Sequence, residues 1–381
     1  MLPNKPLLKE DYQSVSMTID TIQLRNQENI MLLKGKTSTQ LIPRLFPLLD
    51  GNHTLEQIYE ELSPCPKEII DKTIEMLCKH YVIEDASLID ECGLSEYELQ
   101  KYSDVLNFMT LFSERSLPGD QRTNKYMLLK ALLDKTCVVY GLGRLGSVVA
   151  KLLAESGIGH LILCDDAIVS HVNFMDYDLE EEKKITRAEA MKEYLHKRNE
   201  YLDVRVGSSD IKMLKSIDKA DIVIMAEDIM VNQRCELLNR ICVENNIPWI
   251  NIKMGELKFQ IGPLVVPHET ACFECCQNRL NGNILYFDEE QSYIKYKNME
   301  ADKVRIFTSD LFINIVSNIA VWEVVKFLSK IYSSVAMGRL LEFDALSMEL
   351  TSSNILKMPK CRICSIKEKQ PLIEPYAVYL P

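Results

Sequence analysis

Apolar and polar residues alternate along the first part of the chain in the way expected of short strands. Residues 15–19 and 22–24 alternate with period two, and the phase shifts between the two stretches. Residues 26–29, Asn-Gln-Glu-Asn, form a turn sequence, and the apolar run of residues 30–33 follows it. Because side chains in a strand point alternately to opposite faces, the pattern predicts two or three half-buried strands joined by turns.

Helical patterns follow these strands. Three helices are predicted, over residues 38–49, 54–62 and 66–80. Thr54 and Gln57 have the spacing of a capping box, in which each residue satisfies a backbone amide of the other. The third helix carries apolar side chains on one face, at Ile69, Ile70, Thr73, Ile74, Leu77 and Cys78. Strands followed by helices predict a small winged-helix-like module over residues 1–86.

A different pattern begins near residue 136. Four short apolar runs, each expected to be a buried strand, cover residues 137–140, 161–164, 221–226 and 248–252. Strands alternating with helices predict a mainly parallel, doubly wound sheet. The expected fold class is therefore α/β, with the winged-helix-like module, a helical linker at residues 87–130 and a Rossmann-like domain at residues 131–381.

Composition and charge exclude some classes of protein. The chain has 381 residues, of which 47% are hydrophobic and 26% charged, which is a globular balance for two or three domains. There are 44 Lys and Arg residues against 55 Asp and Glu residues. The resulting net charge of −11 argues against a broad nucleic-acid-binding surface.

We expect a cytoplasmic protein with no membrane segment. Residues 1–12 lack the apolar run of a signal peptide. The most apolar long stretch, residues 311–328, is interrupted by polar residues that include Glu323 and Lys326, so it predicts a buried helix rather than a membrane span. In the cytoplasm the 12 cysteines are not expected to form disulfides, which leaves metal ligation as a use to consider.

Three glycines follow the strand predicted at residues 137–140. Gly141, Gly143 and Gly146 have the spacing that lets a chain turn tightly and bring its backbone close to a phosphate at a helix N-terminus. Asp165 stands 24 residues after Gly141, at the end of the next strand, where an acid can bind a ribose. The alternative is that the glycines serve only the packing of a helix on the strand, and the motif alone leaves both open.

Two C-x-x-C pairs are spaced for metal binding. Cys272 and Cys275 form one pair, and Cys361 and Cys364 form the other. The sulfurs of one pair can reach a single metal ion, and two pairs complete a tetrahedral four-thiolate site. Such a site has no open coordination position, so the expected cofactor is a structural zinc ion. The alternative is unligated cysteines, and Cys276 is either another ligand or a buried residue.

The second part of the chain resembles the ThiF-type, ubiquitin-activating-enzyme-like adenylating fold over about residues 100–366. The matching segments occur in the family's order, at residues 141–147, 155–165, 220–228 and 262–267, with Asn173 eight residues after Asp165 and the two cysteine pairs in the family's positions. The resemblance implies that Asp165 is the ribose-site acid and Asp228 the magnesium-site acid. It also implies that the cysteine pairs hold zinc.

The chain departs from adenylating members where they bind phosphates. Arg144 occupies a loop position that is glycine in those members, and Asp176 stands where they have an arginine. Glu189 corresponds to their phosphate-binding lysine if no gap intervenes. Acids in these two places would repel a polyphosphate, so neither ATP nor magnesium is expected to bind. The degenerate nucleotide site comprises Gly141, Gly143, Gly146, Asp165 and Asp228. The alternative is a cation that acts from a shifted position, namely Arg144, Lys183, Lys184 or Arg187.

The first module carries a second resemblance. Residues 48–58, Leu-Leu-Asp-Gly-Asn-His-Thr-Leu-Glu-Gln-Ile, are similar to a run in the precursor-peptide recognition elements of enzymes that modify ribosomally made peptides. Such modules bind an extended leader peptide by strand addition at an open sheet edge beside a helix. The edge is expected near residues 30–33 and the groove wall at residues 66–80. The expected peptide-binding residues are Ile30, Leu32, Leu33, Lys67, Ile70, Asp71 and Ile74.

The alternative for this module is a winged helix used for dimerisation or for nucleic acid. Glu68, Asp71 and Glu75 make the third helix acidic, which argues against nucleic acid as the partner.

Together the two resemblances imply a ThiF-like partner protein of thiazole and oxazole formation in modified peptides such as bacteriocins. In those systems the partner binds the leader of the precursor, and a separate YcaO-family protein holds ATP and activates the peptide amide. We therefore predict a leader-binding scaffold subunit of a cyclodehydratase complex, a homodimer, with no catalytic residue of its own. One alternative is a peptide-adenylating enzyme of the microcin C type. Another is an activator of a sulfur carrier or ubiquitin-like protein, which would leave the first module unexplained.

Overall fold

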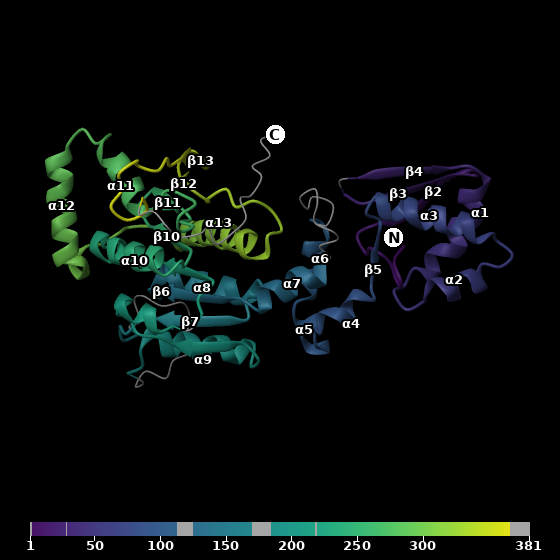
Figure 1. Cartoon of the computed structure of the whole chain (residues 1–381), viewed down its shortest axis with the longest axis horizontal. Helices are drawn as coiled ribbons and strands as arrows, with labels where there is room; N and C mark the ends of the chain where they lie inside the picture. The colour runs from purple at the N-terminus through teal and green to yellow at the C-terminus, as the bar shows by residue number, and fades with distance from the viewer. Residues whose placement is uncertain (1, 28, 113–124, 170–183, 218, 366–381) are drawn as a thin grey trace. The chain divides into compact units, whose positions relative to one another are not determined.

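The computed structural model describes residues 2–27, 29–112, 125–169, 184–217 and 219–365. The chain forms two compact units, Met1–Lys130 (unit 1) and Ala131–Pro381 (unit 2). Figure 1 labels the helices and strands of both. Each unit is described by itself.

Unit 1 contains a three-stranded antiparallel sheet. Its strands are, in order, β2 (Gln13–Thr18), β3 (Thr21–Arg25) and β4 (Ile30–Lys34). The register pairs Ile22 with Leu33, and both side chains are buried on the face that meets the core. The strands predicted from the alternation are confirmed, with small shifts of their ends. The exception is β2, which is exposed along its whole length instead of half-buried.

Three helices pack with this sheet. They are α1 (Lys36–Leu45), α2 (Leu55–Glu61) and α3 (Lys67–Lys79). The predicted capping box at the start of α2 is confirmed, since the Thr54 hydroxyl accepts from the Gln57 N–H and the Gln57 amide oxygen accepts from the Thr54 N–H. Apolar side chains from β3, β4 and the helices form one buried core, which includes Leu24, Leu33, Leu45, Ile58, Ile70 and Ile74.

A second, smaller pairing completes unit 1. β1 (Pro6–Leu8) pairs antiparallel with β5 (Ile83–Asp85), so these strands form a two-stranded sheet separate from the first. The N-terminal strand of this pair has too few residues to show a period in the sequence. The remaining helices of unit 1 are α4 (Leu88–Cys92), α5 (Glu96–Lys101) and α6 (Ser103–Thr110), and α7 (Lys125–Leu133) spans the boundary at Lys130.

Unit 2 is built on an eight-stranded sheet in the order β13–β12–β11–β10–β9–β6–β7–β8. The strands from β10 to β8 run parallel, and β11, β12 and β13 extend the sheet in antiparallel pairs. The bounds are β6 (Thr136–Tyr140), β7 (His160–Cys164), β8 (Asp203–Val206), β9 (Ile222–Met225), β10 (Trp249–Lys253), β11 (Lys258–Ile261), β12 (Arg339–Asp344) and β13 (Glu349–Asn354). The sequence pattern predicted four of these strands and missed β8 and the antiparallel extension.

Buried apolar runs explain the parallel part of the sheet. Every residue of β6 and of β9 is buried, as expected for parallel strands that are covered on both faces. The helices of unit 2 are α8 (Arg144–Glu155), α9 (Arg187–Arg198), α10 (Asn232–Glu244), α11 (Phe273–Asn281), α12 (Phe287–Met299) and α13 (Asp310–Ser329). Helix α13 lies alongside α8 (Figure 1). The predicted mixed α/β class is therefore confirmed.

Helix α13 coincides with the apolar stretch that predicted a buried helix. It is long and apolar enough to cross a membrane, yet 61% of its most apolar window is buried inside the protein. Its buried Glu323 accepts hydrogen bonds from Lys326 Nζ at 2.5 Å, from the Ser334 hydroxyl at 2.7 Å and from the Ala336 N–H at 3.0 Å. Because a buried carboxylate needs such partners, these contacts place α13 in the core of the unit.

Candidate functional site

A cavity of about 790 Å³ lies where the parallel strands β6, β7 and β9 end. This is the edge at which open α/β sheets bind ligands. Gly141 and Gly143 line the cavity, and Gly141 has a φ of +84°, which favours glycine. A Cβ atom at Gly143 would lie 2.1 Å from Asp228 Oδ2, and one at Gly146 would lie 1.8 Å from the carbonyl oxygen of Gly141. The obstacle at Gly146 is backbone, so close packing requires glycine there, whereas a side chain at Gly143 would have to displace the Asp228 carboxylate.

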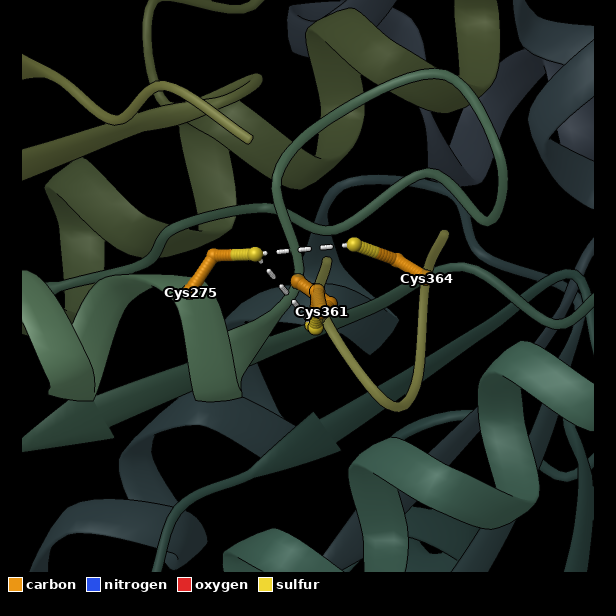
Figure 2. Close-up of side chains that lie close together, drawn as sticks. Cys275, Cys361 and Cys364 are labelled. Atoms are coloured by element: carbon orange, nitrogen blue, oxygen red, sulfur yellow. Dashed lines mark hydrogen bonds between the residues drawn. The ribbon is translucent and has the colours of Figure 1, made fainter. Parts of the chain in front are cut away.

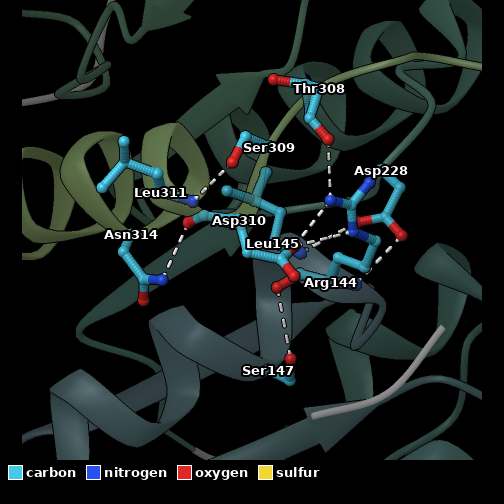
Figure 3. Close-up of polar contacts among 9 residues, drawn as sticks. All are labelled: Arg144, Leu145, Ser147, Asp228, Thr308, Ser309, Asp310, Leu311 and Asn314. Atoms are coloured by element: carbon cyan, nitrogen blue, oxygen red, sulfur yellow. Dashed lines mark hydrogen bonds and ion pairs between the residues drawn. The ribbon is translucent and has the colours of Figure 1, made fainter.

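Backbone N–H groups of the glycine loop already have acceptors within the protein. The Leu142 N–H donates to Asp165 Oδ2 at 2.7 Å. The N–H groups of Arg144 and Leu145 donate to the two carboxylate oxygens of Asp228, at 3.0 and 2.9 Å (Figure 3). A glycine loop at a helix N-terminus offers such groups to a phosphate. In this chain these three N–H groups are therefore paired with carboxylates of the protein.

The side chain of Arg144 joins the glycine loop to the start of α13. Its Nη2 and Nε atoms donate to Asp310 Oδ1 at 2.6 and 3.0 Å, and Nη2 also donates to the Thr308 carbonyl oxygen at 2.9 Å (Figure 3). Only 28% of the Arg144 side chain is exposed. A glycine at this position could not make these hydrogen bonds, so the link between the glycine loop and α13 depends on Arg144.

The prediction that Glu189 repels phosphates is wrong. Its carboxylate accepts from the N–H of Thr186 at 2.8 Å in a capping box that starts α9, and Glu189 does not line the cavity. Hydrogen bonds from Thr186 lower the pKa of this exposed carboxyl group. The residue of α9 that lines the cavity is Arg187, one of the cations considered as a shifted replacement, and its Nη1 lies 3.5 Å from Asp165 Oδ2. Asn173, Asp176 and Lys183 lie outside the described residues.

The cavity carries charges of both signs. Its described lining residues include three carboxylates and four guanidinium groups, at Asp165, Glu227, Asp228, Arg144, Arg187, Arg234 and Arg305. Burial raises the pKa of Glu227, and the Arg234 guanidinium, 2.7 Å from Glu227 Oε1, opposes that rise. Lys184 is not among the lining residues. The cavity is thus not acidic overall, which differs from the repulsion of phosphates that the sequence predicted.

The four predicted cysteines come together in a buried cluster. Cys272 Sγ lies 3.6 Å from Cys361 Sγ and 3.9 Å from Cys275 Sγ, and the Cys275 and Cys364 sulfurs are 3.5 Å apart. Figure 2 shows the sulfurs of Cys275, Cys361 and Cys364 pointing toward one another. Cys276 is buried but outside the cluster. The position of Cys272 at the N-cap of α11 and of Cys275 in its first turn lets both reach one point.

The cysteine cluster fits a tetrahedral metal ion. Sulfurs bound at about 2.3 Å to one zinc ion are separated by about 3.8 Å, which matches the observed spacing. The Met358 N–H donates to Cys275 Sγ at 3.3 Å, a contact that favours a thiolate. Without a metal, burial and the neighbouring thiols raise the pKa of Cys275. The cluster can therefore hold a metal ion such as zinc, and four protein ligands would leave no position for substrate.

Unit 1 has a groove of about 360 Å³ between β4 and α3. Leu32 and Leu33, both predicted as peptide contacts, line it. Ile30, also predicted, lies on β4 with 61% of its surface exposed. The other lining residues are Lys34, Leu41, Ile42, Ile69, Lys72, Thr73 and Met76.

The remaining predicted contacts on α3 lie elsewhere. Ile70 and Ile74 are fully buried in the core, and the Lys67 ammonium lies over the ring of Tyr59, whose hydroxyl donates to Asp71 at 2.5 Å. The stripe of apolar residues on α3 is wide enough to serve both the core and the groove. Sequence reasoning selected its core side, whereas Ile69, Lys72, Thr73 and Met76 face the groove. The position of Ile69 at the border of that stripe is a sequence signal that could have identified the groove side, and the structure shows this residue exposed.

The features of unit 2 define a class of protein. A doubly wound sheet, a glycine loop with acids at the ends of neighbouring strands and a four-cysteine cluster together mark a Rossmann-like α/β fold with a site that can hold a metal ion. The profile described as "ThiF family" matches residues 115–363, which is more than half of the chain. The chain therefore belongs to the ThiF family.

Relatives of known name agree with this assignment. The chain is 21% identical over 241 residues to the molybdopterin-synthase adenylyltransferase of Escherichia coli K12, a match that covers 62% of this chain and 89% of the relative. It is 28% identical over 163 residues to ubiquitin-like modifier-activating enzyme 5 of Caenorhabditis elegans, covering 37% of each.

Two solved structures share the fold. The E. coli microcin C7 biosynthetic enzyme MccB, in complex with N-formylated MccA, superposes with a TM-score of 0.66 at 20% identity and covers 94% of this chain and 99% of its own. The structure of PaaA has a TM-score of 0.64 at 20% identity and covers 80% of this chain and 97% of its own. At these identities the likeness establishes the fold alone.

Proposed function

We propose that this protein binds the leader of a ribosomally made precursor peptide through unit 1 and presents the rest of the peptide to a separate YcaO-family cyclodehydratase. In this proposal the protein does not adenylate the peptide. It works in the cytoplasm as a homodimer, and zinc in the cysteine cluster has a structural role. The observation that carries the proposal is the groove between β4 and α3, which lies beside the edge strand of an antiparallel sheet.

The free edge of β4 supports peptide binding by strand addition. The Gly35 N–H donates to the Asp20 carbonyl oxygen, and the Asn26 N–H donates to that of Asn29. With the β3–β4 register, these two contacts direct the backbone of Met31 and Leu33 toward β3. The N–H and C=O groups of Ile30 and Leu32 consequently point away from β3. An extended peptide can pair with those groups.

The glycine loop supports the absence of adenylation. Adenylating members have glycine where this chain has Arg144. The Arg144 guanidinium is bound to Asp310 and to the Thr308 carbonyl oxygen, and these contacts would have to open before that guanidinium could contact a phosphate. Each of these contacts is a charge-assisted hydrogen bond, so a phosphate has to replace interactions that are already favourable.

A second candidate function is ATP-dependent adenylation of the bound peptide. The observation that favours it is the position of Arg187, a cation that lines the cavity together with the two family acids. The fold likeness to MccB, an enzyme of microcin C7 biosynthesis, adds support.

Calorimetry with the full chain tests both functions. The probes are the N-terminal half of a short precursor encoded beside this gene and, separately, ATP with magnesium. The scaffold proposal expects micromolar binding of the peptide and no heat from the nucleotide. ATP binding together with peptide-stimulated exchange of pyrophosphate into ATP would establish the second candidate instead. Binding of neither probe would contradict both.

Substitution of Leu32 by proline is expected to weaken leader binding at least about tenfold. Proline removes the N–H of Leu32, which points away from β3, and is tolerated on an edge strand. The matched control is Ser14→Pro, because the register gives Ser14 an outward N–H on β2, at the other edge of the same sheet. Circular dichroism checks the fold of both variants. Equal affinity in Leu32→Pro and wild-type protein would show that the peptide does not pair with β4.

A further inference from the structure

The groove beside β4 combines apolar surface with positive charge. Ile69 and Met76 on α3 face it across from Leu33 on β4. The charged residues among its described lining residues are Lys34 and Lys72, and both are exposed. No carboxylate lines the groove within the part of the chain that the structure describes. The groove is thus a local positive site on a chain whose net charge is −11.

The positive charge that the groove offers to a ligand is that of Lys72, since Lys34 has partners within the protein. Glu68 and Glu75 stand one turn from Lys72 on α3, but no ion pair joins them to it among the described residues. Asp20 lies near Lys34, and its carboxylate accepts hydrogen bonds from the hydroxyls of Thr18 and Thr21. Lys72 is therefore the cation on the helix side that is available to a ligand.

Strand pairing fixes which side chains of a bound peptide enter the groove. Residues of an added strand that lie opposite Met31 and Leu33 project to the face on which Leu33 packs, because paired residues share a face. Their neighbours in sequence, opposite Ile30, Leu32 and Lys34, project to the other face. Peptide side chains two residues apart therefore enter the groove.

We propose that the leader recognised by unit 1 is an anionic, amphipathic segment. Two side chains of the leader, two residues apart in its sequence, enter the groove. One is apolar and packs against Leu33, Ile69 and Met76, and the other is Asp or Glu and pairs with Lys72. This inference rests on the proposed leader binding and adds the chemical class of the leader. A neutral or basic peptide would not form the charged contact with Lys72. The net negative charge of the chain repels an acidic peptide at long range, so the preference for an acidic peptide depends on the contact inside the groove. Local charge in the groove thus selects the ligand.

Selection from a display library of random short peptides tests the inference on the full-length protein. The wild-type chain is expected to enrich peptides with an apolar residue and an acidic residue two positions apart. Lys72→Glu is expected to bind the enriched acidic peptides about tenfold more weakly, because attraction is replaced by repulsion, and to select Lys or Arg at the same position. Added salt should reduce the difference between the two proteins.

Lys79→Glu is the matched control, since it makes the same charge change at the exposed end of the same helix and does not line the groove. Thermal unfolding checks that both variants fold. Enriched peptides without an acidic preference, or an unchanged selection by Lys72→Glu, would overturn the inference and leave peptide binding intact. Failure to enrich any peptide would overturn the proposed function as well. Self-association that depends on Lys72 would assign the groove to a second copy of the chain and overturn the inference.

Discussion

Replacing Cys275 with alanine is expected to release the metal and to destabilise unit 2 by more than about 4 kcal/mol. The cluster lies in the core, where Cys275 Sγ contacts Cys364 Sγ at 3.5 Å, and removal of one of four ligands leaves three buried thiols. Loss of this much stability corresponds to a fall in melting temperature of roughly 8–16 °C for a domain of this size. Metal analysis of the purified protein and calorimetric unfolding measure the two effects.

Cys276→Ala provides the matched control. Cys276 is equally buried and is the next residue in α11, but its sulfur is not part of the cluster. We expect this variant to keep the full metal content and to lose only about 1 kcal/mol, since it removes one small buried group. Equal zinc content in the Cys275→Ala and wild-type proteins, or absence of zinc from both, would contradict a four-cysteine zinc site.

Replacing Gly146 with alanine is expected to prevent normal folding of unit 2 or to cost more than about 3 kcal/mol. The added Cβ would lie 1.8 Å from the carbonyl oxygen of Gly141 and 3.0 Å from that of Ala226. Both obstacles are backbone atoms, so neither can move without displacing α8 from β6 or β9. Chemical denaturation of the full chain, followed by circular dichroism, measures the loss.

Gly282→Ala is the control for this substitution. Gly282 ends α11 with a φ of −65°, and a Cβ there would meet only carbonyl oxygens 3.6 Å away. Alanine should therefore be neutral or stabilise the protein by about 0.4–1 kcal/mol. If Gly146→Ala were as stable as Gly282→Ala, the close approach of α8 to the Gly141 loop would be wrong.

Sequence patterns identified much of the fold because the relevant signals are local. Apolar runs located β6, β7, β9 and β10, since strands covered on both faces must be apolar throughout. The strands that escaped prediction are different. β13 (Glu349–Asn354) is exposed at every position, so its sequence shows no burial pattern, and pairing with β12 is what makes it a strand.

Two expectations at the candidate sites differ from the structure for physical reasons. Glu189 corresponds to the phosphate-binding lysine of the family only if no gap intervenes, and the structure shows that this condition does not hold. The local signal of Thr186 and Glu189 at capping-box spacing could have placed the carboxylate at the start of α9 and Arg187 toward the cavity. On α3, one side of the apolar stripe packs in the core of unit 1 and the other side lines the groove beside β4. Periodicity in the sequence does not show which side is which.

The sequence by itself determined the elements whose residues interact over a few positions. These are most of the short strands, the capping box of α2, the tight glycine turn and the two halves of the cysteine site. Tertiary structure alone decided that the Asp228 carboxylate would accept from the N–H groups of Arg144 and Leu145, and that the Arg144 side chain would pair with Asp310. It also decided that β4 would be an edge strand beside α3. Such contacts depend on how strands are ordered and helices packed. The pattern of apolar and polar residues along the sequence does not show which residues far apart in the chain come into contact.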